Sequence, residues 1–364
     1  MQINFVELRN FRNYSFEKFM LNNGINILLG DNAQGKTNLL ESIYFSCIGK
    51  SFKTKNEKEL IKSGSVNAKI FVDFEKNNGK NTISVEFKDN KKFIKLNEIN
   101  ITKTSSMLGN LACVFFSPSE LKLVKEAPED RRRFLDIDIS QLNLDYYNSL
   151  IKYNKILKER NKLLKSTENE KVIEQTLPIW DCQLSKAGSE IVAFRLEFID
   201  KLNLRAKIEH NYLSNGKENL ILEYSSCDNF KEKSLEEIEK ILLKRLTESH
   251  EKDLKLKYTT IGPHRDDIKI YLNNMEVKSF GSQGQQRTSL LSIKLAELEI
   301  FKEVFNEYPI LLLDDVFSEL DDSRKERLFN RVKPLQTLIT TTKFDMPDFD
   351  NAKIIKIENG KIVL

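Results

Sequence analysis

Residues 30–37 read Gly30-Asp31-Asn32-Ala33-Gln34-Gly35-Lys36-Thr37. This spacing, G-x-x-x-x-G-K-T, is the Walker A pattern of a phosphate-binding loop. The two glycines let successive backbone N–H groups turn toward phosphate oxygens, the lysine adds positive charge, and the threonine hydroxyl can reach Mg²⁺. The stretch therefore predicts ATP and Mg²⁺ as cofactors.

The residues on either side of this loop support the same interpretation. Residues 25–29 form a short apolar run typical of a buried strand, and residues 38–43 carry leucines and isoleucine at helical spacing. A glycine-rich turn with an incidental lysine would lack this order of strand, loop and helix. A helix over 37–47 would also direct its positive end at the bound anion. The predicted ATP-binding residues are Gly30, Asp31, Asn32, Ala33, Gln34, Gly35, Lys36, Thr37 and Asn38.

Arg12 is a further candidate for contact with ATP. It lies in the polar turn 9–13, between two strand-like runs at 3–8 and 14–21. Either this turn is only a hairpin loop, or Arg12 leans over the nucleotide from the edge of the site. The sequence favours neither alternative.

A second acidic motif lies near the end of the chain. Residues 310–313 read Ile-Leu-Leu-Leu, and Asp314 and Asp315 follow them directly. An apolar strand that ends in two carboxylates is typical of a Walker B element. Asp314, together with Thr37, is the predicted Mg²⁺ ligand, and Asp315 is predicted to orient or deprotonate the attacking water.

The segment Ser282-Gln283-Gly284-Gln285-Gln286-Arg287 precedes a predicted helix over 288–305. A small, flexible loop at a helix N-terminus is a possible anion site. The segment resembles the signature loop of ABC ATPases. That resemblance implies that Ser282, Gln283, Gly284 and Gln285 contact the γ-phosphate held by a partner chain. The predicted catalytic residues are Lys36, Asp314, Asp315 and Ser282.

The rest of the chain predicts two kinds of structure. Strand-like runs at 68–74, 82–87 and 93–96 predict an antiparallel meander over the nucleotide-binding lobe. Apolar residues repeat at spacings of four, three, four and seven over 146–164 and at close to 3.5 residues over 177–202, which predicts two antiparallel helices. Other strands are predicted at 111–116, 220–224, 254–258, 268–272 and 275–277, and another helix at 235–246.

Composition limits the classes of function. The 364 residues include 58 Lys and Arg against 54 Asp and Glu, so the net charge of +4 excludes a histone-like polycation but allows a local basic patch. The four cysteines form no C-x-x-C pair, which indicates a reduced cytosol rather than disulfides or zinc. No basic leader with an apolar segment begins the chain, and no apolar run approaches about 20 residues. We therefore expect a soluble, cytoplasmic and nucleoid-associated protein with no membrane contact.

The motifs together resemble the RecF family of bacterial recombination mediators. The resemblance covers essentially the full length. It is carried by the Walker motifs and by residues 8–14, 131–136, 262–267 (Gly-Pro-His-Arg-Asp-Asp) and 282–287. It implies an α/β fold: an ABC-type P-loop ATPase head with a mixed sheet and an antiparallel meander, plus a smaller inserted helical lobe. The predicted head spans 1–125 and 210–364, and the predicted lobe spans 126–209.

The resemblance also implies an activity and partners. The expected protein is an ATP-dependent homodimer that binds gapped or duplex DNA without sequence preference and acts with RecR and RecO to help RecA load. The resemblance implies an ATPase stimulated by DNA, and three departures from the wider ABC pattern imply that hydrolysis is slow. Asp315 replaces the usual glutamate, Thr341-Thr342-Lys343 replaces the switch histidine, and no clear Q-loop glutamine follows residues 111–116. The predicted DNA contacts are Lys50, Lys53, Arg131, Arg132 and Arg133.

Several alternatives stay open on sequence grounds. The chain could be another P-loop ATPase related to structural-maintenance-of-chromosomes proteins, a metabolic P-loop kinase, or a scaffold that binds nucleotide only to dimerise. A nuclease-linked ATPase would need a carboxylate-rich metal domain for which no residues remain. The roles of Thr342 and His264 stay open; His264 has no second ligand at metal spacing.

Overall fold

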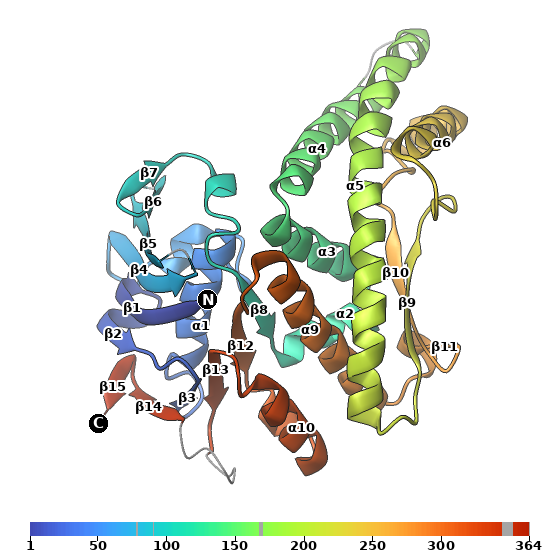
Figure 1. Ribbon diagram of the computed structural model, residues 1–364. Coiled ribbons are helices and arrows are strands. Elements are labelled where there is room, and N and C mark those ends of the chain that lie inside the picture. The colour runs from blue at the N-terminus through green and yellow to red at the C-terminus, as the bar shows by residue number, and fades with distance from the viewer. Residues whose placement is uncertain (78, 90, 167–169, 344–351, 364) are drawn as a thin grey trace. The chain divides into compact units, whose positions relative to one another are not determined.

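The computed structural model describes residues 1–77, 79–89, 91–166, 170–343 and 352–363 (Figure 1). Contacts divide the chain into two compact units. Unit 1 comprises Met1–Glu120 and Lys294–Leu364, and unit 2 comprises Leu121–Ile293. This division differs from the predicted one, because residues 210–293, which we assigned to the head, group with the helical residues. The reason is that the long helix α5 (Glu170–Ser214) packs against elements on both sides of residue 210 in the sequence.

Unit 1 contains a six-stranded sheet that carries both Walker motifs. Its strand order is β15-β14-β3-β13-β12-β8, and all neighbours are parallel except the β14–β15 pair. Because the carboxyl ends of parallel strands meet at one edge, the residues after β3, β13, β12 and β8 come together there. The strands are β3 (Ile25–Leu29), β8 (Cys113–Phe116), β12 (Ile310–Asp314), β13 (Thr337–Thr341), β14 (Lys353–Glu358) and β15 (Lys361–Val363).

A second sheet of unit 1 is the predicted meander, extended by the N-terminal hairpin. Its order is β2-β1-β4-β5-β6-β7, with all neighbours antiparallel. Along β4 the buried side chains alternate, as expected for a sheet with one face on the core. The predicted strands at 3–8, 14–21, 68–74, 82–87 and 93–96 are confirmed. They correspond to β1 (Gln2–Phe11), β2 (Tyr14–Met20), β4 (Asn67–Lys76), β5 (Gly79–Lys88) and β6 (Lys91–Leu96), and β7 (Ile99–Ile101) follows.

Helix α1 (Lys36–Ile48) lies between these two sheets. It contacts β4 and β5 of the meander and β8, β12 and β13 of the parallel sheet. Nearly all of its side chains are therefore buried, including the polar Glu41, Ser42 and Ser46. A helix that is buried on all sides is held by packing rather than by one apolar stripe. The residues that directly follow the phosphate loop are therefore held firmly in place.

Unit 2 is mainly helical. The long helix α5 packs against α4 and α6 and against β9 of a small sheet ordered β11-β10-β9, as Figure 1 shows. Helix α9 (Gln283–Phe305) begins in unit 2, five residues before its predicted start, and α10 (Asp322–Val332) belongs to unit 1. The unit 2 elements are α2 (Lys122–Lys125), α3 (Pro128–Leu142), α4 (Leu144–Leu164), α5 (Glu170–Ser214), β9 (Leu220–Ser225), α6 (Leu235–Glu248), α7 (His250–Leu256), β10 (Asp267–Leu272), β11 (Met275–Glu276) and α8 (Val277–Phe280).

The strand predicted at 254–258 is wrong. Leu254 lies in helix α7, where it packs with Leu164, Ile173 and Leu177, and Lys257 ends the helix with φ of 60°. A short apolar run does not distinguish a strand from a buried helical turn, because its period cannot be read over so few residues. None of the helices over the described residues combines the length and apolar character that a bilayer crossing requires.

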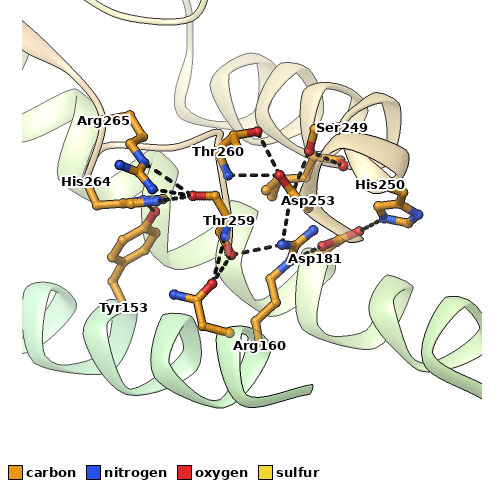
Figure 2. A network of polar contacts seen from close by, with 12 residues as sticks. Tyr153, Arg160, Asp181, Ser249, His250, Asp253, Thr259, Thr260, His264 and Arg265 are labelled. Atoms are coloured by element: carbon orange, nitrogen blue, oxygen red, sulfur yellow. Dashed lines mark hydrogen bonds and ion pairs between the residues drawn. The ribbon is translucent and has the colours of Figure 1, made fainter. Parts of the chain in front are cut away.

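A buried ionic network joins α4, α5, α7 and the loop that follows α7 (Figure 2). Arg160 on α4 donates to Asp181 at 2.8 Å, to Asp253 at 2.7 Å and to the Thr259 hydroxyl at 2.9 Å. All three charged side chains are fully buried. Because unpaired charges are costly in such surroundings, this set must form together, and it fixes the start of the loop that carries the Gly-Pro-His-Arg-Asp-Asp string.

His264 of that string has a structural place. Burial lowers the pKa of His264 to about 4, so the imidazole is neutral at neutral pH. Its Nε2 lies 3.1 Å from the Thr259 carbonyl and its Nδ1 lies 2.6 Å from the Tyr153 hydroxyl (Figure 2). A carbonyl can only accept, so Nε2 carries the proton and Nδ1 accepts from Tyr153. His264 therefore holds the string in position.

Candidate nucleotide-binding site

The phosphate loop connects β3 to α1 in a backbone shape that requires glycine at residue 35. Gly35 has φ of 117°. A Cβ atom there would lie 2.7 Å from Asn13 Nδ2 and 2.8 Å from the Tyr14 hydroxyl. No side chain fits at these distances, so the close approach of the N-terminal hairpin and the left-handed backbone both select glycine.

Residues from both ends of the chain brace this loop from outside. Asn13 Nδ2 donates to the Gln34 carbonyl at 2.9 Å, and the Tyr14 hydroxyl donates to the Gly35 carbonyl at 2.9 Å. From the turn between β14 and β15, Gly360 N–H donates to the same Gln34 carbonyl at 3.0 Å. With these carbonyls held outward, the loop is shaped before any phosphate arrives, which reduces the ordering cost of binding.

Lys36 is the cation of the loop. Its Nζ donates to the carbonyls of Gly30 at 2.6 Å and Asp31 at 2.7 Å. Burial lowers the pKa of Lys36, and the nearby carboxylates of Asp315 and Asp314 partly oppose that effect. The ammonium group is thus desolvated and contacts two carbonyl oxygens. Phosphate oxygens of a bound nucleotide can replace these carbonyl oxygens as its acceptors.

The Walker B carboxylate lies directly against the end of the phosphate loop. Thr37 Oγ1 donates to Asp314 Oδ1 at 2.8 Å, so two segments 277 residues apart meet in one contact. Carboxylate and hydroxyl oxygens are the donors that Mg²⁺ prefers, and this pair fits it. Thr37 and Asp314 would hold Mg²⁺, which would offset the charge of the phosphates.

Thr340 is a site residue that the sequence motifs did not reveal. It lies on β13, between the two motif-bearing strands, and its hydroxyl donates to Asp314 Oδ1 at 2.8 Å. The Thr340 hydroxyl oxygen also accepts from the backbone N–H of Asp315 at 2.9 Å. One hydroxyl therefore orients the Asp314 carboxylate and fixes the backbone of Asp315. The only hint in the sequence is a polar residue near the end of an apolar strand.

Thr340→Val is expected to weaken Mg²⁺-dependent ATP binding about tenfold, since loss of such a supporting hydrogen bond typically costs 10–100-fold in metal affinity. Valine keeps the shape but leaves Asp314 Oδ1 and the Asp315 N–H without this partner. A Mg²⁺ titration of ATP binding checks the effect, with Thr340→Ser as the matched control. An unchanged Mg²⁺ midpoint in Thr340→Val would contradict the assigned role.

Asp315 follows the strand in a left-handed conformation with φ of 54°. It is exposed, in contrast to the buried strand before it. Asp314 and Asp315 line a cavity of about 390 Å³ together with the phosphate loop and Thr342. The open carboxylate at the rim of this cavity has the access to water that its predicted role requires.

Lys53 also lines the cavity, although the sequence analysis assigned it to DNA. Its Nζ donates to Asn38 Oδ1 at 2.9 Å, and burial lowers its pKa. Arg12 does not line the cavity; its guanidinium donates to both Glu41 oxygens, at 2.9 and 2.6 Å. These contacts place Lys53 nearer to a bound nucleotide than Arg12, whose contact with ATP stays a prediction. Lys50, just after α1, is exposed.

The three predicted DNA-contact arginines differ in exposure. Arg131 is buried, and its Nε and Nη2 donate to the two carboxylate oxygens of Asp267 at 2.6 and 2.9 Å. The prediction that Arg131 contacts DNA is therefore wrong, because a buried bidentate pair leaves the guanidinium no access to an external phosphate. Arg132 is half-buried and donates to the Asp266 carbonyl, and Arg133 is exposed.

The predicted signature loop, residues 282–285, lies in unit 2 at the start of α9. Gln285 N–H donates to Ser282 Oγ at 3.3 Å, and Ser282 N–H donates to Gln285 Oε1 at 2.8 Å. This reciprocal pair is a capping box, which satisfies two of the unpaired N–H groups at a helix N-terminus. The Ser282 hydroxyl accepts in this pair, so its own O–H can still donate to an anion.

Comparisons with known proteins agree over the whole length. The AAA domain family matches residues 6–343. The protein called DNA replication and repair protein RecF of Clostridium perfringens (strain SM101 / Type A) is 44% identical over 366 residues, covering 100% of this chain and 99% of that protein. The protein of the same name in Clostridium novyi (strain NT) is 45% identical over 367 residues, with the same coverage.

Solved structures give the same result. A structure of the recombination mediator protein RecF-ATP in the RecFOR pathway is 35% identical, with a TM-score of 0.91, and covers 100% of this chain and 97% of that chain. The Smc head domain from Pyrococcus furiosus, solved bound to the C-terminal domain of ScpA, has a TM-score of 0.58 at 17% identity, covering 100% of this chain and 96% of that chain. The second likeness concerns the fold alone.

Proposed function

This chain belongs to the RecF family of DNA replication and repair proteins, and we propose that it is an ATP-controlled clamp on DNA. It binds ATP as an ATPase of the AAA type. In the proposal, Lys36, Thr37 and Asp314 hold ATP and Mg²⁺ in one subunit. Ser282 and Gln285 of a second subunit then close over the γ-phosphate, so that ATP assembles the homodimer.

The observation that carries the proposal is the Thr37–Asp314 contact within the cavity lined by the phosphate loop. The signature loop, by contrast, belongs to the other compact unit. Its Ser282 hydroxyl can donate to an anion while it caps α9. An anion-binding loop and a separate donor loop are the two halves that a shared nucleotide pocket needs.

The proposed DNA contacts are basic residues, namely Lys50, Arg132, Arg133 and, when ATP leaves it accessible, Lys53. Contacts to phosphates give affinity without sequence preference and make it sensitive to salt, with a log–log slope of about −0.9 per neutralised phosphate. The substrate would be gapped or duplex DNA in the cytoplasm, at the nucleoid. RecR and RecO would be the partners with which the clamp helps RecA load.

Hydrolysis opens the clamp in this proposal. Asp315 orients the attacking water, and its short side chain and the Thr342 side chain at the switch position make the step slow. DNA would stimulate it by stabilising the closed dimer. The ATPase then acts as a timer rather than a motor.

Light scattering tests the proposal in one sample. With ATP and gapped DNA, the protein mass is expected to rise from that of one 42.4 kDa chain toward that of two chains, because ATP completes the interface. Lys36→Ala is the control that should stay at one chain under all conditions. ATP turnover per molecule should also rise with protein concentration.

Two results would sink the proposal. One is ATP turnover per molecule that is constant down to very low protein concentration and unaffected by DNA. The other is turnover that responds to a small phosphate acceptor but not to polynucleotide, which would indicate a metabolic kinase.

A further inference from the structure

A polar chain inside unit 2 runs from the signature loop to the interior of the same unit. The Gln285 side chain accepts from Ser282 N–H through Oε1 and donates to Glu218 Oε1 through Nε2, at 2.9 Å. Both ends of the amide are thus fixed, one by the helix cap and one by Glu218. Glu218 belongs to no motif and lies 64 positions earlier in the sequence than Ser282.

The second carboxylate oxygen of Glu218 is also held by a contact. This oxygen, Oε2, lies 3.2 Å from Nε2 of His210, and Nδ1 of His210 lies 2.9 Å from the Ser292 hydroxyl. His210 and Ser292 are fully buried. Ser292 lies on α9, two turns beyond the signature loop, and its hydroxyl donates to the Thr288 carbonyl at 2.7 Å. The chain therefore starts and ends on the same helix.

His210 connects Glu218 to helix α9. Because the Ser292 hydroxyl donates to Thr288, it accepts from His210 Nδ1. His210 thus links Glu218 to Ser292, with one ring nitrogen at each of them.

The backbone of Glu218 is also fixed. Helix α5 ends at Ser214, and Gly216 turns the chain with φ of 73° while its N–H donates to the Asn211 carbonyl at 2.9 Å. Directly after Glu218, Asn219 and Asn273 exchange two hydrogen bonds, at 2.9 and 3.0 Å. The residue is therefore clamped between the end of α5 and the β10–β11 turn.

We propose that Glu218, backed by His210, is a positioning residue that holds Gln285 for contact with the γ-phosphate in the partner subunit. This inference rests on the proposed function, because it gives the signature loop its role in trans. A glutamine side chain ordered in advance does not lose its rotamer freedom during closure. Fixed donors that need no rearrangement are what stabilise charge in a transition state.

The test is the ATPase activity of Glu218→Ala. The variant is expected to lose about tenfold in kcat, since freeing a glutamine side chain costs roughly that factor in rotamer entropy. KM for ATP should stay unchanged, because the phosphate loop of the same chain is untouched. Glu218→Gln, which keeps an acceptor for Gln285, should retain most of the activity. Glu223→Ala, an exposed site on nearby β9, is the matched control and should match the wild type.

Mixing variants separates this inference from the proposed function. A mixture of Glu218→Ala and Lys36→Ala chains forms dimers in which an intact phosphate loop meets an intact signature loop. Its activity should exceed that of either variant alone. The reference mixture is Ser282→Ala with Lys36→Ala, which tests the shared pocket without Glu218.

The outcomes are distinct. If only the Ser282→Ala mixture recovers, or if Glu218→Ala keeps the wild-type kcat, the positioning role of Glu218 is overturned and the shared pocket stands. If neither mixture recovers, the division of the pocket between two subunits is itself wrong. Equal melting temperatures of Glu218→Ala and the wild type would show that a loss of activity in Glu218→Ala is not a folding defect.

Discussion

Asp315→Asn is expected to slow ATP hydrolysis by about 10²–10⁴-fold while ATP binding stays intact, since this is the usual contribution of a positioned general base. Asp315 is exposed at the rim of the cavity and has φ of 54°. Asparagine has the same shape and tolerates this left-handed backbone well, so the loop should keep its conformation. Only the proton acceptor is removed.

The measurements are single-turnover hydrolysis, equilibrium ATP binding and the lifetime of the protein on gapped DNA. The variant should form an ATP-bound dimer that stays on DNA much longer than the wild type. Asp314→Asn is the informative contrast, because Asp314 lies against Thr37 and should be needed for Mg²⁺-dependent ATP binding itself. Near-normal hydrolysis in Asp315→Asn would remove the residue from the mechanism and favour a scaffold that uses ATP only to dimerise.

Arg160→Met is expected to lower the free energy of unfolding of unit 2 by about 3–5 kcal/mol, the usual cost of removing one partner from a buried ion pair. Methionine fits the space of the aliphatic stem, but Asp181 and Asp253 then lose their shared cation in a fully buried site. The Thr259 hydroxyl loses the same partner, so the loop up to His264 should loosen as well.

The only tryptophan of the sequence, Trp180, is adjacent to Asp181 on α5, so urea unfolding followed by its fluorescence reports directly on this network. Lys158→Met is the matched control: it makes the same kind of change at an exposed position on α4. A loss of stability no larger in Arg160→Met than in Lys158→Met would mean that the buried charges do not hold unit 2 together.

The parts of the molecule that the sequence predicted well are those specified by neighbouring residues. The phosphate loop needs two glycines, a lysine and a threonine at fixed spacing between a strand and a helix, and all of these lie within about 20 residues. The meander strands likewise show their buried face through local alternation. Chemistry and periodicity at short range were enough to identify the Walker motifs and the nucleotide class, and the family was implied by the resemblance of the motifs along the chain.

Contacts between distant segments were decided only by the tertiary structure. Thr340 and Gly360 shape the nucleotide site from positions that carry no motif, and Asn13 of the string 8–14 braces the phosphate loop through a contact that the string did not predict. Arg131 was predicted as a DNA contact from its charge, but its partner Asp267 lies 136 residues away and buries it. The physical reason is the same in each case: a polar side chain acquires its role from the group it faces, and that group is chosen by packing of the whole chain rather than by the residues beside it.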